Sequence, residues 1–477
     1  MMSLTTMIIG ITVLFCVAFL YISNRVKGQA SSSFSQYAIG GGTFPLYLVV
    51  FTQIATIMGA GNFIGHATSG FTKGISHIPF VIGEQGSKIV FGLLFAGLAG
   101  KFTYNTLSGM MHDLIHRDKI SKAIVGLLSM SIMLAWLGGQ AKGLGYVFEQ
   151  FTGIDSLPVI IFFNIIFIIY TYLGGIVSVA WTDLIQGIVV VVFSAIFYIS
   201  AFQPVNWSLA ELGTRAIAIA GEDYWSLSNV PVGTILVNFI TGCLGALVAQ
   251  CYWQRCFASK DSKTARNSLL IGGVYCLIAV SLTALVGIVA RVLNPGLDPS
   301  LAMPWLIMNY TPKFVAATVF ALILAAAMSS ADSYLNSAAV ILVDDIIRPF
   351  MKDDSDEKLV KYAKVATIII GVVACFLSIF AESIIGMFSK AYTMAGGGVA
   401  PVLIVGLLWK KDRTKEFTMG TKNSNVTAWG ARVGLLSGAI VSLTISILWG
   451  VVISAISTIV VSLLTKGTPA KKGTVEA

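Results

Sequence analysis

Long apolar runs constrain this chain more than any other feature of its sequence. A helix needs about 20 apolar residues to cross the hydrocarbon core of a bilayer, and runs of that length recur along most of the 477 residues. Only 11% of the residues are charged, against roughly 25% in ordinary soluble domains. The sequence therefore predicts an all-α polytopic membrane protein. The predicted spans are 4–24, 44–71, 77–100, 120–149, 156–174, 177–202, 230–254, 266–294, 313–345, 360–381, 384–409 and 427–449, with a shorter run at 451–465.

The stretch 427–465 is too long for one helix and barely long enough for two. Lys466, Lys471 and Lys472 follow it, and lysines flanking a span favour the cytoplasmic side. This favours a tight hairpin, with a short thirteenth span and a cytoplasmic C-terminus.

Basic residues are distributed unequally between the predicted loops. With the N-terminus outside, the cytoplasmic loops hold 24 of the 31 Lys and Arg residues and the external loops hold four. This bias is typical of membrane proteins, so the net charge of +9 indicates no nucleic-acid partner. The sequence shows no targeting extension, which favours a bacterial inner (plasma) membrane. The predicted cytoplasmic loops are 25–43, 101–122, 255–266, 346–364, 410–432 and 466–477.

The predicted spans fall into two blocks of five, at 44–202 and 230–409. Each block opens with a glycine-interrupted segment, IATIMGAGNFIGHATSG in the first and FITGCLGALVAQCYW in the second. Paired broken segments of this kind indicate an inverted-repeat transporter, although glycine also permits close helix packing in membranes. The remaining parts are an N-terminal span and loop (1–43), an external loop (203–229) and a C-terminal region (410–477).

A stripe of polar residues crosses the segment AAAMSSADSYLNSAA. Ser329, Asp332, Ser333, Asn336 and Ser337 recur at helical spacing, so they share one face of the helix. Serine and asparagine alone would indicate a hydrogen-bonded seam between helices. A buried carboxylate such as that of Asp332 also needs a cation, a proton or a basic partner.

Other ionisable residues occur inside the predicted spans. Asp183 lies near the cytoplasmic start of its span, whereas Glu84 and Lys88 are four residues apart on one helix and could neutralise each other. Hydroxyl and carboxylate oxygens beside a broken helix suit a hard cation such as Na⁺. No cluster of thiolate or imidazole ligands in the sequence suggests a soft metal.

Four motifs together resemble signatures of the sodium:solute symporter family, and the resemblance extends from about residue 35 to 465. They are IYTYLGGIVSVAWTDLIQG, QRCFASKDSKTARNS, AAAMSSADS and GGGVAPVLIVGLLWKK. The resemblance implies a LeuT-type 5+5 inverted repeat with one N-terminal and one or two C-terminal extra helices. It also implies a sodium site made by the backbone carbonyls of Ala55, Met58 and Ala326 and the hydroxyls of Ser329 and Ser330.

Some members of the family have a second sodium site, and the matching positions here are Asp183, Ser329, Asp332 and Ser333. The sequence departs from those members by carrying Asp332 where they carry a serine. A second sodium ion and a proton both remain open at this site.

The resemblance further implies a sodium-coupled symporter, not an enzyme, that imports a small polar solute by alternating access. Motif similarities divide between sugar-transporting and choline-transporting members, so a sugar, an amino acid, an organic cation and a carboxylate all remain open. The alternatives are a membrane-embedded solute sensor and a sodium-independent uniporter on the same fold. The implied solute-binding residues are Asn62, Glu84, Trp136, Gln140 and Gln250, with Thr393 as a weaker one.

Overall fold

The structure, a computed structural model, describes residues 3–30, 32–228 and 230–466. These residues form a bundle of long helices with short helices at both ends, and they contain no β-strand. Eight helices are long and apolar enough to cross a membrane, or ten if each of two bent pairs counts as one span. The helices of 17 residues or more are α1 (Leu4–Ala30), α5 (Ile78–Leu94), α8 (Lys119–Thr152), α9 (Ser156–Phe202), α14 (Ser262–Leu293), α16 (Lys313–Ile341), α17 (Asp356–Phe380), α18 (Ile384–Leu408), α19 (Ala428–Thr444) and α20 (Ile447–Leu464).

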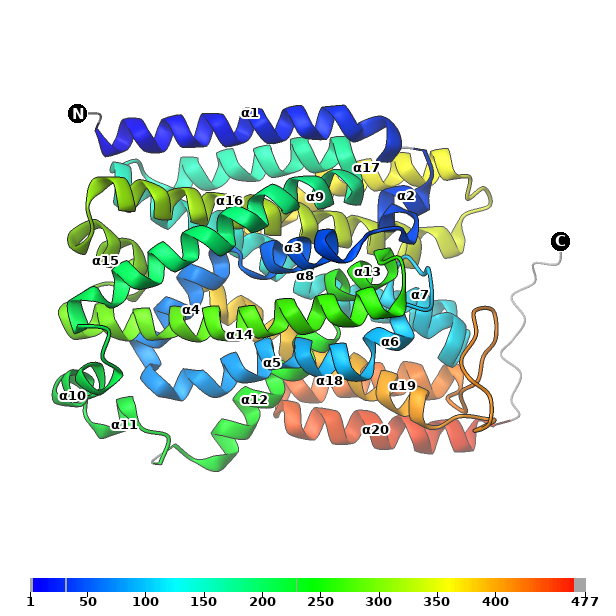
Figure 1. The fold of residues 1–477 in the computed structure, drawn as a ribbon. Coiled ribbons are helices and arrows are strands. Elements are labelled where there is room, and N and C mark those ends of the chain that lie inside the picture. Colours follow the sequence, from blue (N-terminus) through cyan, green and yellow to red (C-terminus); the bar gives the residue numbers. More distant parts are fainter. Residues whose placement is uncertain (1–2, 31, 229, 467–477) are drawn as a thin grey trace.

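Short helices mark the two ends of the bundle (Figure 1). We call them the α10 end and the α7 end, after a helix that lies at each. The α10 end carries α10 (Leu209–Ala220), α11 (Glu222–Trp225) and α15 (Ala302–Tyr310); the α7 end carries α2 (Phe34–Ile39), α6 (Ala96–Ala99) and α7 (Leu107–Met111).

Both glycine-interrupted segments are broken in the structure. The first consists of α3 (Leu46–Ile57) and α4 (Ala60–Lys73). The chain bends by 46° between α3 and the helical segment Ala60–Leu94 that follows it. The second consists of α12 (Val232–Leu247) and α13 (Gln250–Ala258) and bends by 40°. At each break two residues are not helical. Backbone carbonyl groups there have no hydrogen-bond partner within the helix.

Helix α9 combines two predicted spans, 156–174 and 177–202, which meet at Gly175 without a loop. Gly175 has φ 50° and ψ −161°, a backbone conformation that side chains rarely adopt. A Cβ atom at this position would lie 2.8 Å from Cδ2 of Tyr37 in α2. Conformation and space together therefore require glycine at the turn.

Helix α16 lies at the centre of the bundle. Its most apolar window is 83% buried, against 22% for that of α1 at the periphery. It packs against α8, α9, α17, α1, α3 and α13, and every residue of the polar stripe is buried. The stripe therefore faces protein on all sides.

The stretch 427–465 forms two helices, α19 and α20, separated by Ile445 and Ser446. Small residues line their contact: a Cβ atom at Gly434 would lie 1.9 Å from Oγ1 of Thr458. Close approach through small residues is a common way to pack helices in membranes. The expected hairpin with an additional short span is confirmed.

Candidate functional site

The broken end of α3 lies directly against the polar stripe of α16. Oγ of Ser330 donates a hydrogen bond to the carbonyl of Thr56 at 2.9 Å and lies 3.3 Å from the carbonyl of Ala55. Tyr334, one turn further along α16, donates its hydroxyl to the same Thr56 carbonyl. The structure thus brings together two of the five predicted sodium ligands, Ala55 and Ser330.

The other predicted ligands lie beside this contact. Met58 caps α3 with ψ 50° and so ends its helical hydrogen bonding, and Ala326 lies on α16 one turn before Ser329 and Ser330. All are completely buried.

Three buried oxygens near this contact have no hydrogen-bond partner among the described residues. They are Oγ of Ser329, Oδ1 of Asp183 and Oδ2 of Asp332. Buried polar atoms in proteins normally have a partner, so a bound cation would satisfy these three oxygens; the side-chain amides of Gln53 and Gln186 are also unpartnered among the described residues. Hydroxyl and carboxylate oxygens are hard donors that suit sodium.

Arg255 of α13 carries the cation that the sequence analysis missed. Its guanidinium lies 3.3 Å from Oδ2 of Asp183 and donates hydrogen bonds to Oγ of Ser333 at 2.7 Å and to Oγ1 of Thr56. It also donates to Thr52, and its side chain is only 1% exposed. The sequence predicts that Arg255 lies in a cytoplasmic loop. This prediction is wrong, because Arg255 belongs to α13 and lies beneath the end of α3.

The lower part of the stripe is a seam between α16 and α13. Nε2 of Gln254 donates to Oδ1 of Asn336 at 3.0 Å, and Oγ of Ser337 donates to Oε1 of Gln254 at 2.5 Å. These two residues of the stripe therefore hold helices together, as expected for serine and asparagine.

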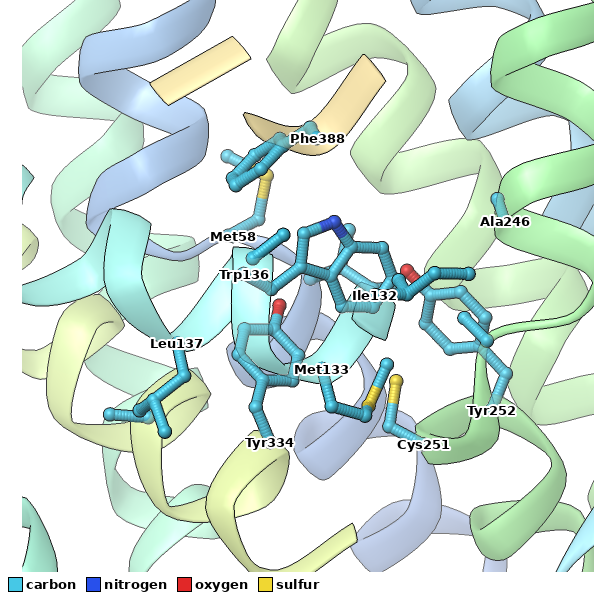
Figure 2. Packing of buried hydrophobic residues seen from close by; sticks show 14 of the residues in the cluster. Met58, Ile132, Met133, Trp136, Leu137, Ala246, Cys251, Tyr252, Tyr334 and Phe388 are labelled. Atoms are coloured by element: carbon cyan, nitrogen blue, oxygen red, sulfur yellow. The ribbon is translucent and has the colours of Figure 1, made fainter. Parts of the chain in front are cut away.

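Trp136 of α8 lies at the centre of an aromatic cluster between the two breaks. Figure 2 shows its indole between Tyr334 and Tyr252, with Phe388 on the side toward Met58. The ring centroids of Tyr334 and Tyr252 lie 4.9 Å and 5.7 Å from that of Trp136. Both ring pairs are tilted, and rings in contact at these distances form a rigid apolar surface.

Two predicted solute-binding residues lie between this cluster and the first break. Oε1 of Gln140 accepts from the Gly61 amide at 3.2 Å, while its Nε2 donates to the Trp136 carbonyl at 2.9 Å. The amide of Asn62 donates to the Ile57 carbonyl. The structure thus brings Asn62, Trp136 and Gln140 together.

Glu84 of α5 reaches the same cluster through Tyr392, whose hydroxyl donates to Oε1 of Glu84. Its other oxygen accepts from Gln85 at 2.9 Å and lies 3.2 Å from Nε2 of His66. Lys88 instead donates to the Glu84 backbone carbonyl at 2.9 Å. Among the described residues Lys88 thus makes no direct ion pair with the Glu84 carboxylate, which histidine and tyrosine contact.

The last two predicted solute-binding residues are placed differently. Gln250 accepts from the Leu107 amide and donates to the Asn105 carbonyl, both at 2.9 Å, so it ties α13 to the loop at the α7 end. Thr393 is half-buried on α18, next to Tyr392.

Hollows open at both ends of the bundle. The one at the α10 end has a volume of about 430 Å³ and reaches inward to His77 and Phe80. The one at the α7 end has a volume of about 530 Å³ and is lined by Lys122 and Asp344, which form an ion pair at 2.9 Å. The aromatic cluster and the polar stripe lie between the two hollows.

Comparisons with known proteins agree with this arrangement. A model of the sodium:solute symporter family matches residues 37–420. The sodium/glucose cotransporter of Vibrio parahaemolyticus is 26% identical over 84% of this chain and 80% of its own length. The high-affinity choline transporter 1 of Drosophila melanogaster is 24% identical over 86% and 67%, and the sodium/sialic acid symporter SiaT of Proteus mirabilis is 24% identical over 87% and 86%.

Solved structures give the same fold. A Na⁺-coupled sialic acid symporter, in a substrate-bound outward-open state, superposes with a TM-score of 0.80 at 21% identity, covering 96% of this chain and 98% of that one. The nucleobase-cation-symport transporter Mhp1, in a closed conformation, superposes with a TM-score of 0.63 at 16% identity, covering 91% and 95%. The predicted LeuT-type fold is thereby confirmed.

Proposed function

The chain belongs to the sodium:solute symporter family and is a sodium-coupled symporter; we propose that its sodium ion binds where the broken end of α3 meets α16. The observation that carries this proposal is the group of buried oxygens without partners, of which Ser329 Oγ lies in the predicted ligand set. The carbonyls of Ala55, Met58 and Ala326 and the hydroxyls of Ser329 and Ser330 then surround the ion. Because these groups come from two helices, the bound ion holds α16 against α3.

A charge count supports a second cation close by. Asp183 and Asp332 carry two negative charges when ionised, and Arg255 supplies one positive charge. An uncompensated buried charge is costly, so the site takes a sodium ion or a proton at the free oxygens of Asp183 and Asp332. Ser333, the other residue predicted for this site, is already bonded to the guanidinium.

The solute binds at the aromatic cluster, where Asn62, Trp136, Gln140 and Glu84 surround the first break. Thr393 lies at the edge of the aromatic cluster. Gln250 instead helps to close the α7 end of the bundle, where it accepts a hydrogen bond from the loop there. The ring surfaces and amides suit a small polar solute with an apolar face. The relatives transport choline, glucose and sialic acid by name, and these compounds are the first to test.

The bundle lies in the plasma membrane with the α10 end outside and the α7 end in the cytoplasm. The basic residues of the predicted loops support this orientation. The solute enters from the α10 end, and rocking of one part of the bundle against the other opens the α7 end. Each sodium ion that moves inward gains about 2.3 kcal/mol per 100 mV of membrane potential.

The test is uptake into proteoliposomes with and without a sodium gradient, using choline, glucose, sialic acid and pantothenate. Sodium should stimulate the uptake of one of them, and Ser329→Ala and Ser330→Ala should weaken that stimulation. Ser378→Ala is the matched control, since that hydroxyl is buried but bonds only within its own helix α17. Sodium-independent uptake with the same kinetics in all three variants would indicate a uniporter instead.

A further inference from the structure

Two histidines and a glutamate form a continuous buried chain of titratable groups. Nδ1 of His66 lies 2.9 Å from Nε2 of His77, and Nε2 of His66 lies 3.2 Å from Oε2 of Glu84. The three residues are 0%, 2% and 1% exposed, respectively. Three groups that each bind and release protons are thus in contact with one another inside the bundle.

The chain of groups connects two places already described. His77 lines the hollow at the α10 end. At the other end, Glu84 accepts from Tyr392, whose ring lies edge-on to Trp136 at 5.8 Å. The chain therefore runs from an opening at one end of the bundle to the centre of the proposed solute site.

The bonding of the histidines differs from that of packing residues. Neither imidazole forms a hydrogen bond to a backbone group of the described residues; Nδ1 of His66 is hydrogen-bonded to His77, whereas its Nε2 lies 3.2 Å from Oε2 of Glu84 without a hydrogen bond. Imidazole accepts a proton on one nitrogen and releases one from the other, and it does so near neutral pH. The contacts place the three groups in the order that a proton relay requires.

We propose that His77, His66 and Glu84 carry a proton from the hollow at the α10 end to the Glu84 carboxylate. This proposal builds on the proposed function, because Glu84 belongs to the solute site. A hydronium ion in the hollow protonates Nδ1 of His77 and leaves as water. The proton on Nε2 of His77 passes to Nδ1 of His66, and the proton on Nε2 of His66 passes to Oε2 of Glu84. One proton enters, no net charge stays on either ring, and Glu84 becomes neutral.

A neutral Glu84 changes what the solute meets. The ionised carboxylate favours a cationic group beside it, whereas the protonated acid donates a hydrogen bond to an acceptor. Protonation through the relay therefore adjusts solute binding to the pH at the α10 end.

Several other charged and titratable groups face the relay. Arg291 of α14 contacts Phe71 of α4 and the ring of Tyr224, so positive charge lies near the outer end. Lys88 lies on α5 one turn beyond Glu84. The full set is Lys73 on α4, Lys88 on α5, Tyr146 on α8, Tyr224 on α11, Cys243 on α12, Cys251 and Tyr252 on α13, Cys276 and Arg291 on α14, Tyr334 on α16, and Glu382, Lys390 and Tyr392 around α18.

The experiment follows the carbonyl stretch of a protonated carboxylic acid by infrared spectroscopy. The full-length protein is reconstituted in lipid vesicles, and the pH is lowered rapidly from about 8 to about 5, the range in which histidine changes charge. A band that appears in the wild type and is absent in Glu84→Gln reports on Glu84. His77→Gln and His66→Gln should slow the appearance of this band roughly 100-fold, the typical contribution of a positioned proton-transfer group.

His112→Gln is the control, since His112 lines the hollow at the α7 end and should leave the rate unchanged. Two relay variants are used so that loss of folding in one leaves the other informative. A band that is absent in the wild type, or that forms at the same rate in both relay variants, overturns the relay. Sodium-dependent uptake measured in the same vesicles reports on the proposed function independently.

Discussion

Two buried carboxylate clusters lie in the bundle and are neutralised in different ways. In the first, which we call the α16 cluster, Asp183 contacts the guanidinium of Arg255, and Asp332 accepts from Ser333, which the same guanidinium also contacts. In the second, the α5 cluster, Glu84 contacts His66, which contacts His77. Arginine stays charged at every accessible pH, whereas histidine changes charge near neutrality. Arg255 therefore gives the α16 cluster a fixed positive charge beside the proposed sodium site, whereas the charge of the histidines in the α5 cluster can change with pH.

The largest expected effect comes from removing the fixed charge of the α16 cluster. Arg255→Met leaves Asp183 buried without a basic partner, which should lower the free energy of unfolding by about 3–5 kcal/mol. Thermal unfolding in detergent measures this loss. Arg215→Met is the control, because that side chain is exposed and pairs with Glu211 outside the core. Addition of Asp183→Asn should restore part of the stability, and no restoration would contradict the pairing.

The next effect distinguishes the contributions of Ser329 and Ser333 to sodium binding. Ser329→Ala removes a free hydroxyl from the proposed sodium site, and losing one such partner costs about 1–3 kcal/mol, so the sodium concentration for half-maximal uptake should rise about 5- to 150-fold. Ser333→Ala should raise it less, because Arg255 already holds that hydroxyl. Equal effects in both variants would show that the two serines contribute alike.

A smaller effect is expected in the α5 cluster. Tyr392→Phe removes the hydroxyl that donates to Glu84, and hydrogen bonds to charged groups contribute about 1.5–3 kcal/mol. We expect a loss near the lower value, about 1.5 kcal/mol, because Gln85 and His66 still contact the carboxylate. The loss should shrink at low pH, where the relay protonates Glu84. A loss that does not vary with pH would contradict a titrating Glu84.

The smallest effect concerns Asp118, a carboxylate outside the membrane-spanning segments that serves as a reference for both clusters. Burial alone would raise the pKa of Asp118, but hydrogen bonds from Arg432 and Ser121 lower it to about 2. A lowered acid pKa stabilises the fold above the unfolded-state value, and this stabilisation is lost as the pH falls toward 2. Asp118→Asn should cost about 1 kcal/mol at pH 7, since the pair is partly exposed to solvent, and the difference from wild type should disappear in acid.

The sequence predicted which helices and breaks form the site better than which side chains pair with one another across them. Both breaks and the polar face of α16 follow from local pattern, because glycine and helical periodicity act within one segment. Arg255 could not be placed this way: it follows the apolar run 230–254, and a short half-helix carries it back under α3.

The α5 cluster shows the same limit. Glu84 was recognised from the family resemblance, but its contacts with His66 and Tyr392 join residues 18 and 308 positions away. Gln250 was placed in the solute site, yet its side chain bonds to the loop around Asn105. Side-chain pairing between helices depends on their rotation and depth, which no single segment encodes.

The turn at Gly175 has a consequence for the biosynthesis of the protein. Between Lys142 and Arg215 the sequence contains no lysine or arginine, so neither half of α9 carries the basic residues that orient a span during insertion. Because no polar loop separates the two halves at the turn, we expect them to insert into the membrane together. Their orientation is then dictated by the neighbouring segments, and a charge inserted at the turn would disturb assembly before it disturbed transport.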